Sequence, residues 1–158
     1  MIVRPRLPTD DSFLLELGGK AFAKYSRDAP SSMFGMLGER GAEAVVAELA
    51  GVPVGFALLG YQTLPRDYGP WKRPVAARLN AIAVVPEREG RGIGRRLLSA
   101  AEEVARASGA VSVWLLTAET NRRARTLFSS GGFQPVLRLP RAYVRGQAGV
   151  TMFKLLDA

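Results

Sequence analysis

The order of apolar and polar positions along the chain predicts an alternation of strands and helices. Runs bounded by glycine and proline predict strands at residues 2–4, 43–49, 54–61, 78–84, 111–117, 133–139 and 150–156. Apolar residues at helical spacing predict helices that begin at Thr9 or Asp10 and that span residues 30–37, 92–108 and 121–130. We place a tight turn at residues 50–53 and a long loop at residues 62–74.

Length and composition fit a single globular domain over residues 1–158, because 47% of the residues are hydrophobic and 23% are charged. No apolar run is long enough to cross a membrane, and the N-terminus lacks an apolar signal segment. We therefore expect a cytoplasmic protein without a membrane partner.

The chain contains no cysteine and no histidine, which excludes several kinds of chemistry. Disulfides, thiolate nucleophiles and thiolate metal sites all need cysteine. A histidine base and a histidine metal ligand are excluded in the same way, and we expect no metal. Proton transfer must therefore use a carboxylate, a tyrosine, the backbone, a terminus or water.

The net charge of +8 is concentrated in the second half of the chain. Residues 1–75 hold 9 Lys+Arg and 8 Asp+Glu, a net of +1, whereas residues 76–158 hold 13 and 6, a net of +7. Such an excess can mark nucleic-acid binding. Here, however, the arginines cluster beside two predicted helix starts, at Arg88, Arg91, Arg95, Arg96, Arg122, Arg123 and Arg125. That placement suits a phosphorylated cofactor, and we expect no nucleic-acid partner.

Residues 82–98 carry the strongest functional signal, because they predict a strand, a glycine-dense turn and the first turn of a helix. Gly90, Gly92 and Gly94 let the backbone approach a ligand with no Cβ in the way. The N–H groups that follow have no partner inside the helix and lie at the positive end of its dipole. Together with the nearby arginines they predict a phosphate-binding site.

Two common phosphate motifs do not fit this turn. A Walker-type ATP loop needs a lysine and then Ser or Thr where Arg95 and Arg96 stand. The dinucleotide fingerprint needs a third glycine where Arg95 or Leu97 stands. In addition, no carboxylate ends the next strand, about twenty residues on, to hold a ribose.

The remaining pattern resembles motif A of the GNAT superfamily of N-acetyltransferases, Gln/Arg-x-x-Gly-x-Gly/Ala after a strand of the type apolar-Ala-Val-x-Pro. The chain matches this motif at residues 82–84, Pro86, Gly92 and Gly94, and departs from it at Glu89. Residues 119–133 resemble the family's motif B, Glu-x-Asn-x-x-Ala-x-x-apolar-Tyr-x-x-x-Gly-Phe. The resemblance spans nearly the whole chain and is strongest between residues 82 and 133.

The resemblance implies an α/β (α+β) fold. Its centre would be a mixed, mostly antiparallel sheet of about six or seven strands, splayed between strands 4 and 5 and flanked by about four helices. It also implies acetyl-coenzyme A as cosubstrate, with its pyrophosphate on the amides of the turn and its pantetheine on the splayed strand. The implied cofactor-binding residues are Ile82, Ala83, Val84, Glu89, Gly90, Arg91, Gly92, Ile93, Gly94, Arg95 and Asn121.

Two of these residues carry a second interpretation. Glu89 stands where the family has Gln or Arg, so we expect its charge to repel phosphate to some extent. Asn121 would contact the cofactor near the pantetheine by analogy with the family, but it is equally suited to cap a helix.

The usual proton-transfer groups of the family are absent. The tyrosine that commonly protonates the leaving thiolate aligns with Phe128, and the glutamate that some members carry aligns with Leu116. Strand alternation places Asn80 on the face of Ile82 and Val84, where it would act through a water. The other substitutes are Tyr61, Tyr143 and, through water, Glu48. None stands out, and the catalytic residue is unassigned.

In the family the acceptor enters opposite the cofactor, between the first two helices, the hairpin and the last loop. Our candidate acceptor-binding residues are Tyr25, Tyr61 and Asn80. Asp28 or Glu39 would suit a cationic amine, or equally a solvated surface charge. Further residues that would line the pocket, or else serve as core and loop anchors, are Phe22, Met33, Phe34, Met36, Tyr68, Trp71 and Tyr143.

The resemblance implies transfer of an acetyl group from acetyl-coenzyme A to a primary amine of a small molecule or a protein. The lack of cysteine favours direct attack in a ternary complex. Phe128 leaves open the alternative of a non-catalytic module that binds or senses acyl-coenzyme A. Val113, Trp114 and Leu115 suit a homodimer interface or a buried central strand equally well.

Overall fold

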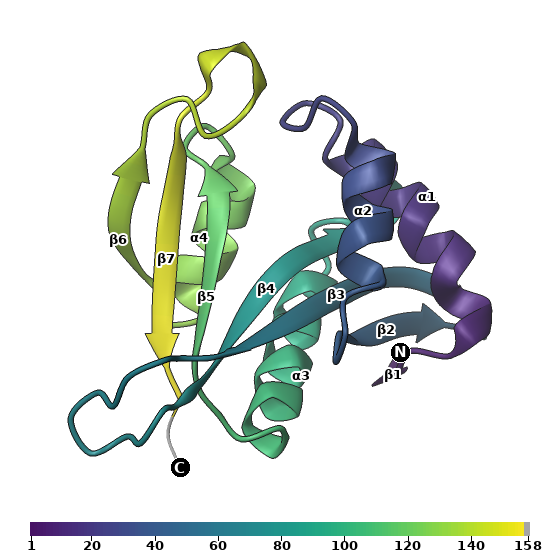
Figure 1. Cartoon of the computed structure of the whole chain (residues 1–158). Coiled ribbons are helices and arrows are strands. Elements are labelled where there is room, and N and C mark those ends of the chain that lie inside the picture. Colours follow the sequence, from purple (N-terminus) through teal and green to yellow (C-terminus); the bar gives the residue numbers. More distant parts are fainter. Residues whose placement is uncertain (157–158) are drawn as a thin grey trace.

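The computed structural model describes residues 1–156 and contains one mixed sheet (Figure 1). Its strand order is β1-β2-β3-β4-β5-β7-β6. Every neighbouring pair is antiparallel except β4 and β5, which are parallel. The strands are β1 (Ile2–Pro5), β2 (Glu43–Leu49), β3 (Val52–Thr63), β4 (Val75–Val84), β5 (Ala110–Ala118), β6 (Gln134–Leu139) and β7 (Gly149–Leu155).

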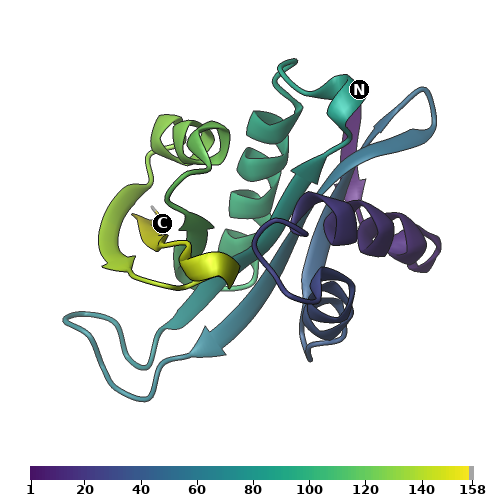
Figure 2. The same ribbon diagram turned by 90° about the horizontal axis from the view of Figure 1, so that it is seen from above.

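Helices cover the sheet unequally on its two faces (Figure 2). One face packs against α3 and α4 through a core that includes Leu97, Leu115 and Phe128. The other face packs against α1 and α2 through Leu14 and Met33, and only β2, β3 and β4 contribute to that core. The helices are α1 (Asp11–Ala21), α2 (Ala29–Leu37), α3 (Ile93–Ala107) and α4 (Arg122–Ser130), with single 3-10 turns at Pro8–Asp10, Pro86–Arg88 and Val144–Gly146.

The predicted mixed, mostly antiparallel sheet with a splay between strands 4 and 5 is confirmed. β4 pairs with β5 only from Val75 to Arg78, and from Leu79 onward its only partner is β3. The two parallel strands therefore diverge toward their C-terminal ends, as Figure 1 shows. No helix in residues 1–156 has the length and apolar character that a membrane span requires.

The first hairpin turn is tighter than predicted. We expected a turn at residues 50–53, but it contains only Ala50 and Gly51, both with positive φ, and β3 already begins at Val52. Two positive φ values in a two-residue loop are the geometry that matches the twist of a hairpin. Pro53 is tolerated inside the strand because the ladder to β4 starts only at Gly55.

Gly55 lies where β3 and β4 approach each other closely. A Cβ there would lie 2.9 Å from the carbonyl oxygen of Ala83 and 3.0 Å from Leu97 Cδ1. Because the first of these atoms is backbone, Gly55→Ala is expected to lower the free energy of unfolding by about 1–3 kcal/mol. Urea unfolding measures this change. The control Gly35→Ala, in open space on α2, should instead stabilise by about 0.5–1 kcal/mol.

Candidate active site

The open end of the splayed sheet gathers two helix N-termini. β4 and β5 are parallel, so their C-terminal ends point the same way, and each is followed by a helix, α3 and α4 respectively. Both helices therefore begin beside the gap between the strands (Figure 1). The positive ends of two helix dipoles and their unpaired amides lie there together.

The turn before α3 has the properties expected of a phosphate-binding loop. Gly90 and Gly92 have φ of +76° and +80°, and a Cβ at either would meet nothing within 4 Å. Within residues 1–156, the amides of residues 90–95 donate no hydrogen bond to another protein group. These donors are free for an anion. Gly94 differs, because a Cβ there would lie 3.4 Å from Leu127 of α4, so its smallness also serves helix packing.

Glu89, which stands where the family has Gln or Arg, has an ion-pair partner on α4. The Glu89 carboxylate forms an ion pair with Arg123, which we did not predict. The pair neutralises the charge that we expected to repel phosphate, and it connects the turn to the first helical turn of α4. The only advance signal was the arginine cluster at residues 122–125, since neither side chain alone indicates the contact.

Asn121 and the outer edge of β4 complete the predicted cofactor side. Asn121 Oδ1 accepts a hydrogen bond from the amide of Ala124 at 3.2 Å, so this side chain caps α4 as one of our two interpretations required. Ile82 and Val84 are half-buried against the α3 face, and Ala83 is buried on the opposite face. Their side chains belong to the cores, while one backbone edge of the strand faces the gap.

The family's usual acid and base positions are occupied by apolar side chains. Phe128 is 4% exposed and packs against Phe133 with 6.0 Å between ring centroids. Leu116 is half-buried and lies against Gly149, since a Cβ added at this glycine would lie 2.8 Å from Leu116 Cδ1. Neither residue can exchange a proton.

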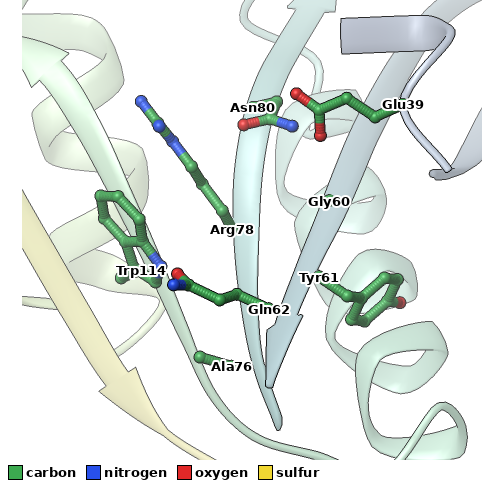
Figure 3. Close-up of a pocket in the computed structure, with 8 residues that line it drawn as sticks. All are labelled: Glu39, Gly60, Tyr61, Gln62, Ala76, Arg78, Asn80 and Trp114. Atoms are coloured by element: carbon green, nitrogen blue, oxygen red, sulfur yellow. The ribbon is translucent and has the colours of Figure 1, made fainter. Parts of the chain in front are cut away.

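A bulge in β4 places Asn80 on the other face from the one predicted. Leu58 pairs with Ala81 and Leu59 with Leu79, so Asn80 is an extra residue on its strand. Alternation across the bulge breaks, and the prediction that Asn80 shares a face with Ile82 and Val84 is wrong. Asn80 instead lines a cavity on the α2 side, together with Glu39, Gly60, Tyr61, Gln62, Ala76, Arg78 and Trp114 (Figure 3).

Tyr61 touches this cavity, but its side chain points away from the other lining residues (Figure 3). The ring packs against the α3 core, and its phenol faces Ser108 and Glu43. Burial raises the pKa of Tyr61 to about 12. The structure therefore does not support Tyr61 as an acceptor-binding or proton-transfer side chain, because residues 61 and 62 face opposite sides of the sheet.

Tyr25 and Tyr143 join the loop after α1 to the loop between β6 and β7. Their ring centroids are 5.5 Å apart, the amide of Val144 donates to the Tyr25 carbonyl at 3.2 Å, and Gln147 Nε2 donates to the Lys24 carbonyl at 2.8 Å. Burial raises the pKa of Tyr143 to about 12, against a smaller lowering by Arg78. The phenol therefore stays protonated at neutral pH.

The other predicted acceptor residues and the dimer candidates differ in burial and in their structural partners. Asp28 caps α2 by accepting from the amide of Ser31 at 3.2 Å, and Glu48 pairs with Arg4 at 2.8 Å, so both have structural partners. Of the dimer candidates, Val113 and Leu115 are buried in the core, whereas Trp114 is half-buried and reaches the cavity. Met33 is core, Phe22 and Met36 pack against it, and Phe34, Tyr68 and Trp71 are exposed.

Metal-ligating side chains do not gather at this site. Across residues 1–156, no group of three or more acidic side chains is placed to hold a metal ion. Sequence reasoning included Asn80 and Glu39 but missed Arg78 and Gln62, which become neighbours of Asn80 only through the register of β3 and β4.

The fold is close to that of several solved acetyltransferases. The ribosomal-protein-alanine N-acetyltransferase from Brucella melitensis aligns over 99% of this chain and 100% of its own, with a TM-score of 0.80 and 23% identity. The putative acetyltransferase yncA from Salmonella typhimurium, solved with its cofactor acetyl-CoA, aligns over 100% of this chain and 95% of its own, with a TM-score of 0.78 and 22% identity. At these identities the likeness concerns the fold.

Sequence comparison gives shorter matches. The chain is 43% identical over 56 residues, 35% of its length, to the uncharacterized N-acetyltransferase YhfO of Bacillus subtilis, and this match spans 38% of that protein. It is 42% identical over 67 residues, 41% of its length, to the mycothiol acetyltransferase of Beutenbergia cavernae, and spans 23% of that protein. The profile of the "Acetyltransferase (GNAT) family" matches residues 11–133. The chain therefore belongs to the GNAT acetyltransferase family.

Proposed function

We propose that the protein is an N-acetyltransferase that moves an acetyl group from acetyl-coenzyme A to a primary amine. The observation that carries the proposal is the gap between β4 and β5, which opens beside a turn whose amides, residues 90–95, have no partner within residues 1–156. A family structure solved with acetyl-CoA has the same fold, with a TM-score of 0.78.

The residues at the gap fit the parts of this cosubstrate. Amides of residues 90–95 and the side chains of Arg91 and Arg95 suit the phosphates, because both arginines are exposed at the start of α3. The unpaired backbone of residues 82–84 suits the pantetheine amides, which need main-chain partners. Asn121 lies at the start of α4 and offers its side-chain nitrogen.

The reaction requires proton movement, because a lysine-like amine has a pKa of about 10.4 and must lose a proton before it attacks. The thioester supplies an activated acyl carbon and a thiolate leaving group. Tyr143 is a protonated phenol and can donate a proton, whereas Phe128, at the family's usual position, has none to give. Positioning of the two reactants supplies much of the remaining rate.

Release of free thiol from acetyl-coenzyme A across a panel of primary amines tests the activity. We expect amine-dependent release, with acetylated amine formed in equal amount. Coenzyme A binding in calorimetry without any thiol release would instead favour the second candidate, a non-catalytic module that binds acyl-coenzyme A. The apolar residues Leu116 and Phe128 are the observation behind that second candidate.

A further inference from the structure

The cavity on the α2 side of the sheet is lined by one carboxylate and one guanidinium, both exposed and both without an ion pair within residues 1–156. It has a volume of about 160 Å³, and its charged lining residues are Glu39 and Arg78. An engineered cavity of about 150 Å³ admits a benzene-sized molecule, so the space suits one small acceptor or a single side chain. In Figure 3 the Asn80 amide lies between the two charged groups.

The Glu39 carboxylate lies over Gly60 of β3. A Cβ at Gly60 would lie 2.8 Å from Glu39 Oε2 and 2.8 Å from Asn80 Nδ2. The carboxylate and the amide of the bulge residue therefore lie no farther apart than twice that distance. Within residues 1–156, Glu39 forms no ion pair, although this chain has many more basic than acidic residues. The carboxylate is free for a cation at the bulge.

Arg78 stands where β4 and β5 part. It is opposite Trp114 in the last pair of the parallel ladder, and its guanidinium carbon lies 4.6 Å from the Trp114 ring centroid. Stacking of this kind orients the guanidinium plane and leaves its N–H donors available. In the described part of the chain, the Arg78 guanidinium makes no hydrogen bond or ion pair besides its stacking on Trp114, and no acidic group other than Glu39 lines the cavity.

We infer that the acceptor is a free amino acid, bound with its ammonium on Glu39 and its carboxylate on Arg78. This inference rests on the proposed function and names its substrate class. A guanidinium with free parallel donors matches a carboxylate in two hydrogen bonds. A simple amine would leave Arg78 unpaired, and so would the amino terminus of a protein, whose carboxyl group is an amide. A zwitterion satisfies both charges and places its nitrogen beside Asn80.

Acceptor specificity tests this inference with the intact protein. Thiol release is measured with each standard amino acid, with its carboxamide, with the amine from which the carboxylate is missing, and with peptides that have a free amino terminus. At least one amino acid should exceed its two analogues in kcat/KM by roughly 10- to 100-fold, the value of hydrogen bonds to a charged group. Equal or better use of the analogues or the peptides would overturn the inference.

Arg78→Gln should remove this preference. It is expected to lower kcat/KM for the amino acid roughly 10- to 100-fold more than kcat/KM for the carboxylate-free amine. Arg66→Gln, an exposed arginine of the loop between β3 and β4, is the matched control and should change neither value. An equal loss for both substrates in Arg78→Gln would contradict carboxylate binding.

Direct binding separates failure of this inference from failure of the proposed function. Amino acids are titrated into the coenzyme A complex by calorimetry, and binding that is weakened in Arg78→Gln and in Glu39→Gln supports the assignment even without turnover. Coenzyme A binding or amine acetylation with no amino-acid binding overturns the substrate class alone. Absence of coenzyme A binding removes the proposed function itself.

Discussion

Gly92→Asp is expected to weaken coenzyme A binding by about 100-fold or more. The substitution places a carboxylate on the open surface above the amides that face the phosphates, at a residue whose Cβ would meet nothing within 4 Å. Juxtaposed like charges cost several kcal/mol, and about 1.4 kcal/mol corresponds to a tenfold change in affinity. Calorimetric titration of coenzyme A into the wild type and the variant measures the loss.

Gly51→Asp is the matched control for backbone strain. Gly51 has φ of +78°, against +80° for Gly92, and a Cβ there also meets nothing within 4 Å. Both variants therefore carry the same conformational penalty, but Gly51 lies in the turn between β2 and β3. We expect Gly51→Asp to bind coenzyme A like the wild type. Equal affinities for both variants would show that the turn at residues 90–95 does not hold the phosphates.

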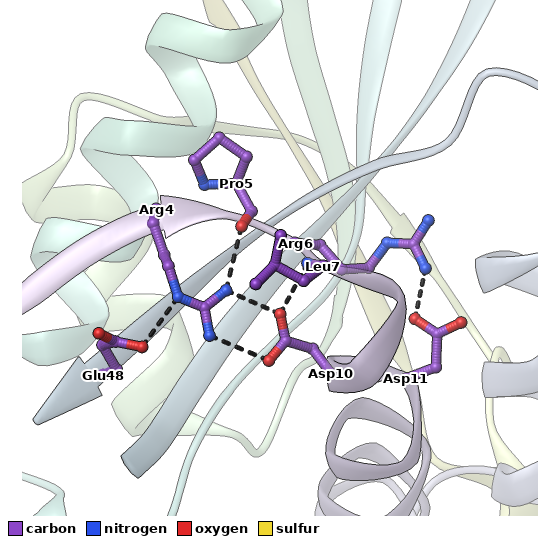
Figure 4. A network of polar contacts seen from close by, with 7 residues as sticks. All are labelled: Arg4, Pro5, Arg6, Leu7, Asp10, Asp11 and Glu48. Atoms are coloured by element: carbon purple, nitrogen blue, oxygen red, sulfur yellow. Dashed lines mark hydrogen bonds and ion pairs between the residues drawn. The ribbon is translucent and has the colours of Figure 1, made fainter. Parts of the chain in front are cut away.

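Arg4→Met is expected to lower the free energy of unfolding by about 2–3 kcal/mol, because it leaves a buried carboxylate without its partner. Asp10 is 4% exposed, and its two carboxylate oxygens accept from Arg4 at 2.7 and 3.0 Å (Figure 4). Arg4 also donates to Glu48 at 2.8 Å and so ties the start of α1 to β1 and β2. Urea unfolding at neutral pH measures the change.

The Arg4 pair also predicts how stability depends on pH. Hydrogen bonding to Arg4 lowers the pKa of Asp10. The ionised Asp10 carboxylate therefore contributes fully to the free energy of unfolding above its unfolded pKa, about 3.9. This contribution is lost as the pH falls through the lower folded pKa. Arg4→Met leaves burial as the main effect, which raises the Asp10 pKa. The wild type and the variant should therefore differ most near pH 7 and converge as the pH falls through the lowered folded pKa of Asp10 in the wild type.

Lys20→Met is the control for the loss of an ordinary ion pair. Lys20 and Glu16 are 75% and 72% exposed, with 3.2 Å between Nζ and Oε1. Exposed pairs of this kind contribute about 0.3–0.5 kcal/mol. A loss in Arg4→Met no larger than that in Lys20→Met, or one independent of pH, would contradict the role given to Asp10.

Regular elements and the phosphate turn were predictable because they depend on local signals. The spacing of apolar residues, together with the glycines that bound each element, predicted the ends of α3 and β5 to within two residues of the observed ends. The glycine spacing also indicated the turn at residues 90–95. The splay between β4 and β5 came from the family resemblance, since no local pattern of residues 75–84 encodes which strand edge stays unpaired.

The acceptor side was predicted less well because it depends on register. One extra residue at Asn80 moves this side chain to the α2 face, and a strand pattern read from sequence does not contain such a bulge. The Glu89–Arg123 pair depends on how α4 returns beside α3. Tyr61 was chosen for its phenol, which can bind a ligand or transfer a proton. The face of the sheet on which its side chain lies is known only once the pairing of β3 is known.

Amide hydrogen exchange, followed residue by residue by NMR with and without coenzyme A, tests the central claim most directly. The claim is that unpaired backbone groups of β4 and of the turn before α3 hold the cosubstrate. We predict that coenzyme A slows exchange at residues 82–84 and 90–95 and leaves β6 and the turn at Ala50 and Gly51 unchanged. Unchanged exchange at residues 90–95 in the saturated complex, with protection elsewhere, would contradict the account.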